Sequence, residues 1–417
     1  PVALTVFSVT HETGVVRVAP GCRDWLSAPI FGSHTLGAAV ATPSHFLSQP
    51  SDVVGTVSHI DQYTAVGLSP TVWGAETRDD IQHNLEHIHE AMSGATWLSG
   101  MELPVKLVVI PEGALQGFTD EIMDMNHTAY REEIAVDIPG WETEQLGEYA
   151  KEFGTYIVAS AKEKAPEYPE KFYNTAFILS PDGELVHKHR KLTPLLPVER
   201  SVTPHDVWDD WVEHHGAELD DLFPVADTEI GRIGISLAIE GAYPEYARGL
   251  AMNGAEVMCR IACPEPLVAS GSWEVQNRAR ALDNTMYVVA PNLGTYHVSP
   301  DAETPVDTFG GGSMVVDYTG DIVAEHEYGA GSSYTAGVVD IERLREHRVE
   351  SPLTNWLKDL RTEYCQVIYD RDLYPKNLWQ DRQPVDHDTY AEEVTESRIQ
   401  DMVDRDIWVR PSHQRDS

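Results

Sequence analysis

Apolar and polar positions follow two patterns through the middle of the chain. Short runs of apolar, β-branched residues bounded by Pro, Gly or Asn predict buried strands. Between several of these runs, apolar residues recur at three- and four-residue spacing, which predicts amphipathic helices. The predicted strands cover 63–68, 105–110, 175–179, 184–186, 230–239, 257–262, 286–290, 312–316 and 321–326. The predicted helices cover 77–91, 244–253 and 272–284, and 149–161 predicts a helix followed by a strand.

This order of elements predicts an α/β layered fold. Strands alternate with helices, which is typical of sheets covered by helices. Two hairpins, with turns at Pro181-Asp-Gly183 and Asp317-Tyr-Thr-Gly320, add antiparallel pairs, so we expect mixed sheets. Ser272 is expected to cap the helix that it precedes.

Three segments are expected. Residues 1–60 mix short apolar pieces with Pro and Gly and lack sustained periodicity, which indicates an N-terminal extension. Residues 61–345 hold the α/β pattern, and 346–417 form a charged, irregular C-terminal extension. Its aromatic residues favour a subunit interface, and hence a homo-oligomer, over packing on the chain's own domain. They are Tyr364, Tyr369, Tyr374 and Trp379.

Charge excludes two classes of partner. The chain carries 30 Lys and Arg against 67 Asp and Glu, a formal net charge of −37. Such a surface repels phosphate backbones and anionic lipids, so we expect no nucleic-acid and no membrane partner. No apolar run reaches the roughly 18 residues of a spanning helix, and the first residues show no signal-peptide pattern. The four cysteines are too few for a disulfide scaffold, which favours a reducing cytoplasm.

Two charged residues follow predicted strands directly. Glu112 comes after the strand at 105–110 and Pro111, and Lys191 comes after the hairpin strand at 184–186 and a basic run. The carboxyl ends of strands are where α/β folds place their sites. A carboxylate held there can act as a base, and a lysine can stabilise an oxyanion. Taken singly, each is better interpreted as a surface charge.

A sharp turn is expected where the strand at 230–239 meets the helix at 244–253. Such a strand–turn–helix unit projects a nucleophile at the strand end, with helix N–H groups behind it. The residue at the turn is Ala238, whose methyl group has no chemistry.

Together these segments resemble the nitrilase, or carbon–nitrogen hydrolase, superfamily. The matching motifs lie between about residues 60 and 345, and each motif contains a residue of the expected site or supports one. They are Pro111-Glu112, Arg190-Lys191-Leu192, the turn at Ala238 with Glu240 two residues on, Tyr243-Pro-Glu245, Asn174-Thr-Ala-Phe177, Gly254-Ala-Glu-Val257, Arg278-Ala-Arg-Ala-Leu-Asp-Asn284 and Gly311-Gly-Ser-Met-Val-Val316.

The resemblance implies a four-layer αββα sandwich with N- and C-terminal extensions, paired subunits and no cofactor or metal. It also implies a Glu–Lys–Cys triad with a second glutamate. Carried over, Glu112 is the general base, Lys191 the oxyanion stabiliser and Glu199 the second carboxylate. Ile239 supplies an oxyanion N–H, and Arg260 is placed beside the substrate as structural support.

Ala238 occupies the position of the nucleophilic cysteine, and two accounts compete. The chain is a Cys-to-Ala variant of an enzyme, or it is a naturally inactive binding or scaffold protein. We favour the first, since the other three catalytic positions are intact. Ser236, two residues back on the strand, and Cys263, past the next strand, are weaker candidates for a replacement nucleophile because neither is at the turn.

The predicted reaction is hydrolysis of a small-molecule amide to a carboxylic acid and ammonia or an amine. Ile239 stands where nitrilases have Trp, and Glu240 with the Tyr-Pro-Glu turn favours aliphatic amidases and formamidases over nitrilases or carbamoyl-amide hydrolases. Long loops with Trp141, Trp208 and Trp211 hint at a larger, aryl substrate. His83 and His87, one helical turn apart, are interpreted as a polar helix face and not as a metal site.

Overall fold

The computed structural model describes residues 58–263, 268–306 and 311–414. From Ser58 onward these residues belong to one compact unit. Of the N-terminal extension expected at 1–60, all but the last three residues lie outside the described ranges. Among the described residues, no helix is both long enough and apolar enough to cross a bilayer.

Two six-stranded mixed sheets carry the fold. In each, the central strands are parallel and the outer pairs are antiparallel. In spatial order the first sheet is β14 (Ser333–Val339), β1 (Tyr63–Ser69), β3 (Val105–Val109), β4 (Tyr156–Lys164), β5 (Phe172–Leu179) and β6 (Leu185–Arg190). The second is β13 (Ile322–His326), β12 (Ser313–Val316), β10 (Tyr287–Ala290), β9 (Val257–Ile261), β8 (Gly231–Leu237) and β7 (Val225–Thr228). The predicted mixed sheets are therefore confirmed.

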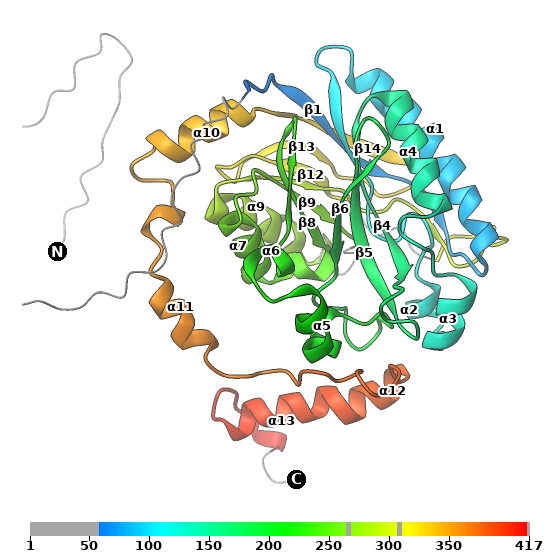
Figure 1. Ribbon diagram of the computed structural model, residues 1–417, viewed down its shortest axis with the longest axis vertical. Coiled ribbons are helices and arrows are strands. Elements are labelled where there is room, and N and C mark those ends of the chain that lie inside the picture. Colours follow the sequence, from blue (N-terminus) through cyan, green and yellow to red (C-terminus); the bar gives the residue numbers. More distant parts are fainter. Residues whose placement is uncertain (1–57, 264–267, 307–310, 415–417) are drawn as a thin grey trace, which may run out of the picture. The chain divides into compact units, whose positions relative to one another are not determined.

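Helices cover the outer face of each sheet (Figure 1). The long helices α1 (Ile81–Ser99) and α4 (Trp141–Phe153) pack on the first sheet, and α7 (Pro244–Met252) and α9 (Ser272–Asn284) pack on the second. Further elements lie between and after these strands and helices. They are β2 (Val72–Trp73), α2 (Thr119–Ile122), α3 (His127–Glu133), α5 (Trp208–His215), α6 (Leu219–Leu222), β11 (Tyr296–His297) and α10 (Ile341–Glu350).

Alternation along the strands explains the layering. Successive side chains of a strand point to opposite faces, so one strand can feed two cores. In β3, Leu107 and Val109 join the core between the sheets, whereas Val108 joins the core under α1 and α4. A third core lies under α7 and α9. The predicted αββα order of layers is thus confirmed.

Local details differ from the predictions at two helix ends. The first helix runs to Ser99, eight residues beyond the predicted end. Ser272 is the first residue of α9 and not its cap, because Gly271, with φ of 76°, makes the turn into the helix. A left-handed φ favours glycine, which has no Cβ to clash with the backbone.

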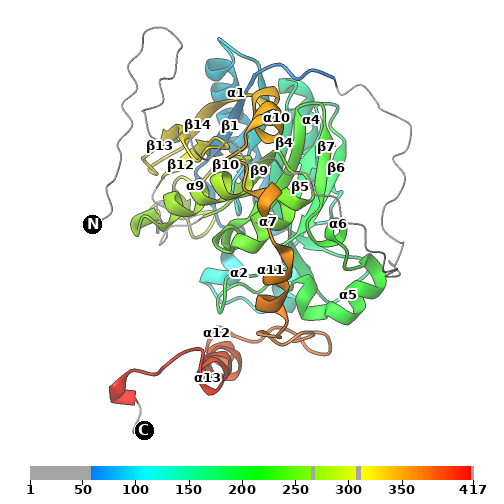
Figure 2. The same ribbon diagram turned by 90° about the vertical axis from the view of Figure 1, so that its left-hand side faces the viewer.

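The C-terminal segment is more regular than expected. It contains α11 (Thr362–Tyr369), α12 (His387–Tyr390) and α13 (Glu396–Asp404), drawn in orange and red in Figures 1 and 2. The helix α10 spans residue 345, where the sequence places a boundary.

Part of the C-terminal segment packs on the rest of the chain. Trp379 and Tyr390 are buried in a small core with Tyr168 and Trp211. The Tyr374 hydroxyl exchanges a hydrogen bond with that of Tyr390. Of the four aromatic residues singled out in the sequence, Tyr374 and Trp379 therefore pack on their own chain, which is the less favoured interpretation, whereas Tyr364 and Tyr369 are exposed.

Candidate active site

Three residues singled out in the sequence meet at one end of the first sheet. Glu112 lies three residues beyond β3, Lys191 directly follows β6, and Glu199 lies in the loop after it. The Lys191 Nζ is 2.8 Å from Glu112 Oε1 and 2.7 Å from Glu199 Oε2. All three residues are buried. Because buried charges are costly unless paired, this contact holds the two strand ends and the loop together.

Asn174, on β5 next to β6, organises both carboxylates. Its Nδ2 donates to Glu112 Oε1 at 2.7 Å and to Glu199 Oε1 at 3.0 Å. Glu199 also accepts from the Ser201 hydroxyl and the Leu195 amide. The sequence motif at 174–177 marked this residue as a supporting one, without its role. An asparagine in a mostly apolar, buried strand is the signal that could have identified it.

A second lysine extends the cluster, and sequence reasoning missed it. Lys162 on β4 is buried, and its Nζ lies 3.2 Å from Asp120, 3.1 Å from Glu121 and 3.5 Å from Glu199. Glu199 is therefore shared by two ammonium groups. The signal was a lysine within the buried strand β4, but its acidic neighbour Glu121 lies 41 residues away in sequence, and such a contact cannot be read from local sequence.

The cluster shifts the pKa values of its members. Burial lowers the pKa of the Lys191 ammonium, but the Glu112 and Glu199 carboxylates outweigh it and raise the pKa above its usual range. Burial likewise opposes ionisation of Glu199, yet Lys191 and Lys162 hold its pKa well below the usual range. Both groups stay charged at neutral pH, which provides a fixed cation beside Glu112.

Glu121 behaves in the opposite way. Burial, which Lys162 only partly offsets, raises its pKa from 4.5 to about 8. Between these pH values the folded chain holds a proton that the unfolded chain has released, so folding stability falls as the pH rises.

We therefore expect Glu121→Gln to stabilise the chain more at pH 9 than at pH 4, relative to the unmodified chain. At about 1.4 kcal/mol per pKa unit, the difference should reach at least about 2 kcal/mol. Urea unfolding at the two pH values measures it. The control is Glu102→Gln, at an exposed position. A gain that does not change with pH would contradict the shifted pKa.

The turn after β8 has the backbone expected of a nucleophile position. Ala238 has φ of +44°, which a residue with a side chain rarely adopts, and a short 3-10 helix (Ala238–Ala242) follows. Glu240 stabilises the turn, because its carboxylate accepts from the Leu237 amide at 2.7 Å and the Leu192 amide at 2.6 Å. The hydrogen bond from the Leu192 amide to Glu240 ties the turn to the residue after Lys191.

Arg260, on β9, supports the same turn from behind. Its Nε donates to the Ala238 carbonyl at 3.3 Å, and its other nitrogens donate to Asn277 and Gln276 on α9. The guanidinium lies 4.4 Å over the Trp273 ring. Burial and the nearby Arg280 lower its pKa to about 9. These bonds hold the guanidinium against the turn and against α9.

The two replacement nucleophiles considered in the sequence lie in different places. Ser236 is buried within β8. Cys263 lies just past β9, and its Sγ donates to Glu112 Oε2 at 3.8 Å. The contact joins the two sheets, since Glu112 extends the first and Cys263 the second.

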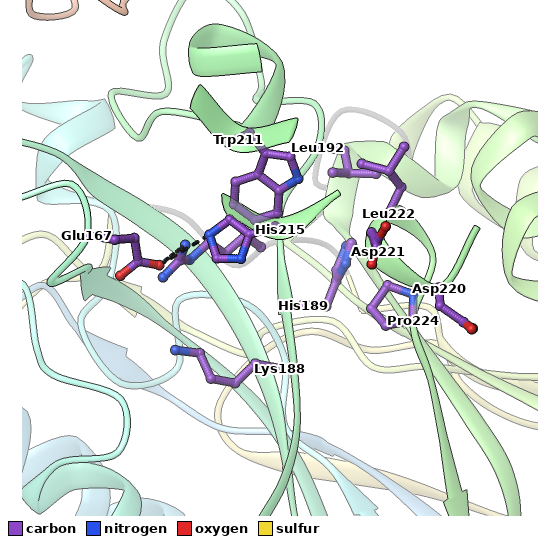
Figure 3. Close-up of a pocket in the computed structure, with 11 residues that line it drawn as sticks. Glu167, Lys188, His189, Leu192, Trp211, His215, Asp220, Asp221, Leu222 and Pro224 are labelled. Atoms are coloured by element: carbon purple, nitrogen blue, oxygen red, sulfur yellow. Dashed lines mark ion pairs between the residues drawn. The ribbon is translucent and has the colours of Figure 1, made fainter. Parts of the chain in front are cut away.

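Two cavities share Leu192, the residue after Lys191, in their lining. One of about 320 Å³ is lined by charged and aromatic residues, and its Glu167 pairs with Arg190 and His215 (Figure 3). The other, of about 520 Å³, is mostly apolar and is lined by the loop from Leu192, by Trp208, by Tyr243 and by Tyr369 of α11. The second therefore reaches the residue after Lys191 and Tyr243, which follows the 3-10 helix that begins at Ala238. Neither cavity is lined by Glu112, Lys191 or Ala238 themselves.

Metal ligands do not gather in the described part of the chain: its His, Cys, Asp and Glu residues form no group suited to hold an ion. The histidines His83 and His87 instead pack edge-on against the ring of Trp73.

Comparison with known proteins agrees with this geometry. Residues 64–348 match the family model described as carbon-nitrogen hydrolase. A formamidase of Bacillus cereus (strain B4264) is 34% identical over 224 residues, which are 53% of this chain and 58% of that protein. The chain thus matches less than two thirds of this relative's length.

Two solved structures share the fold. Nit3 of Saccharomyces cerevisiae, a member of branch 10 of the nitrilase superfamily, has a TM-score of 0.54 and 24% identity over 71% of this chain and 98% of that chain. A cysteine-to-alanine mutant of the Nesterenkonia AN1 amidase has a TM-score of 0.54 and 20% identity over 75% of this chain and 100% of that chain. The fold is therefore that of the nitrilase superfamily, and, since the family model covers more than half of the chain, the protein belongs to the carbon–nitrogen hydrolase family.

Proposed function

We propose that this chain has the site of an amidase-type hydrolase, which converts an amide to a carboxylic acid and ammonia or an amine. The observation that carries the proposal is the Lys191 ammonium, held between Glu112 and Glu199 and tied to the turn at Ala238. The similarity to a formamidase supports an amide as the substrate. A fixed cation beside a carboxylate suits acyl transfer, in which a proton moves while negative charge grows on oxygen.

In the proposed reaction a thiol at position 238 is the nucleophile. Glu112 takes the thiol proton, and the sulfur attacks the acyl carbon. Lys191 and the Ile239 amide stabilise the oxyanion. Glu112 then protonates the departing amine, and the same carboxylate activates the water that hydrolyses the thioester. Asn174 and Glu199 keep Glu112 and Lys191 in position.

The chain itself lacks this thiol, because position 238 is alanine. We propose that the chain is the Cys-to-Ala form of such an enzyme, since a cluster with two buried lysines and three buried carboxylates is costly to keep without a use. The strained φ at Ala238 supports this, because alanine gains nothing from it. The second candidate, a binding or scaffold protein that holds amides without cleaving them, is favoured by Ala238 itself.

Two further expectations remain proposals. The segment from 346 onward contacts a second copy of the chain through α11, where Tyr364, Val367 and Ile368 are exposed. The described cysteines Cys259, Cys263 and Cys365 are free, which suits a reducing compartment such as the cytoplasm.

The experiment that tests the function is substitution of Ala238→Cys followed by assays on acetamide, benzamide, benzonitrile and a carbamoyl amide. We expect ammonia release from the amides, at least about 10²-fold faster than from the unmodified chain, because the thiol then stands at the turn. Ala238→Ser is the matched control for a weaker nucleophile. Release from the nitrile or carbamoyl compound alone would identify the alternative reactions. Amide binding without turnover in the Ala238→Cys chain would favour the binding protein.

A further inference from the structure

The thiol of Cys263 lies beside the base of the proposed site. Strands β8 and β9 are parallel neighbours, with Leu237 opposite Ile261, so the chain leaves both strands at the same edge of the sheet. Ala238 begins one exit and Cys263 lies in the other. The Cys263 Sγ donates to Glu112 Oε2 at 3.8 Å, within the range of a sulfur hydrogen bond.

Glu112 divides its two oxygens between different partners. Oε1 accepts from Lys191 Nζ at 2.8 Å and from Asn174 Nδ2 at 2.7 Å, which fixes the carboxylate. Oε2 accepts a hydrogen bond from the Cys263 thiol. A nucleophile within reach of a base that a third group orients is the arrangement of covalent catalysis.

The other two described cysteines lack this environment. Cys259 lies on β9, four residues before Cys263, and is fully buried in the core between the sheets. Burial raises the pKa of its thiol far above the usual range. Cys365 lies on α11, outside the cluster. The contact with Glu112 therefore distinguishes Cys263 from the rest of the described thiols.

We propose that Cys263 accepts the acyl group of the substrate in this chain, in place of the missing thiol at 238; this rests on the proposed amidase function. Glu112 takes the Sγ proton, the sulfur bonds to the acyl carbon, and the carbon–nitrogen bond breaks as Glu112 returns the proton to the amine. Water, deprotonated by Glu112, then adds to the thioester, and the carbon–sulfur bond breaks with the proton going back to Sγ. The net change is amide plus water to carboxylic acid plus amine.

Two features make this route slow. Burial, together with the Glu112 and Glu121 charges, raises the pKa of the Cys263 thiol well above its usual range, so the thiolate forms only as the base takes the proton. Cys263 also follows β9 and does not stand at the turn after β8, where the nucleophile is expected. A misplacement of about 1 Å can cost about 10²-fold in rate. Turnover through Cys263 is therefore expected at least about 10²-fold below that of the Ala238→Cys chain.

The test is acylation of the unmodified chain with p-nitrophenyl acetate, followed by mass mapping of all four cysteine-containing peptides. We expect one acetyl group on Cys263, and acetylation at least about 10²-fold slower when Glu112→Gln removes the base. Cys263→Ser should abolish the thioester, whereas Cys365→Ser, a matched change at a thiol outside the site, should leave it. An acetyl group on another residue, or labelling of Cys263 at the same rate in the Glu112→Gln chain, overturns the proposal.

The double variant Ala238→Cys with Cys263→Ser separates this inference from the proposed function. If it hydrolyses acetamide while the unmodified chain gains no acetyl group on Cys263, the function stands and the role of Cys263 is wrong. If the unmodified chain is acetylated on Cys263 but neither Ala238→Cys chain releases ammonia, the thiol is reactive and the amidase function is wrong. Peptide mapping of the unmodified chain needs no variant, so a misfolded Cys263→Ser chain would leave the test intact.

Discussion

Replacing Lys191 with methionine is expected to lower the free energy of unfolding by about 3–5 kcal/mol, because it leaves two buried carboxylates without their shared cation. Glu112 would keep Asn174 as its donor, and Glu199 would keep Asn174, Ser201 and Lys162. The variant should therefore fold, with a raised tendency of one carboxylate to hold a proton.

In an Ala238→Cys background, Lys191→Met should also remove about 10²–10³-fold of amide turnover, the typical effect of losing one oxyanion donor. Urea unfolding and ammonia release measure the two effects. The matched control is Lys151→Met, which removes an exposed lysine paired with Glu148 and should change stability by less than about 1 kcal/mol. A Lys191→Met chain as stable and as active as the control would contradict the assignment of Lys191.

Glu112→Gln in the same Ala238→Cys background should reduce turnover by about 10²–10⁴-fold, the range for removing a general base. The amide oxygen of glutamine can still accept from Asn174 or Lys191, so the loss would come from proton transfer and not from collapse of the cluster.

The control for this substitution is Glu121→Gln, which alters a buried carboxyl of the same cluster that no step of the proposed reaction uses. It should change the rate by less than about tenfold. Thermal unfolding of both variants shows whether they are folded. If Glu112→Gln and Glu121→Gln reduced turnover equally, the loss would reflect the charge of the cluster, and Glu112 would not be its base.

Much of the fold followed from periodicity. Strands such as β3 and β9 are short, mostly apolar runs that are covered on both faces of their sheet. Helices such as α7 show a clear apolar stripe. The C-terminal segment was harder to predict, because its aromatic residues have no periodic pattern. Only the tertiary structure shows Trp379 and Tyr390 buried against Trp211.

The positions of Glu112 and Lys191 were visible because each comes soon after a predicted strand, and strands that run in the same direction in one sheet end at one edge. Lys162 and Asn174 lie inside strands, where their contacts depend on which strands are neighbours. Those contacts depend on β4, β5 and β6 being neighbours in the sheet, and local sequence does not encode the order of strands.

The sequence by itself determined the α/β layers, the resemblance to a hydrolase family and the methyl group at the turn, since these depend on short motifs and on local spacing. Only the tertiary structure decided which charges meet. Glu112, Asn174, Lys162 and Lys191 come from the first sheet, whereas Ala238 and Cys263 come from the second. How two sheets stack is set by the packing of the whole core between them, so the contact of Cys263 with Glu112 could not be read from either segment alone.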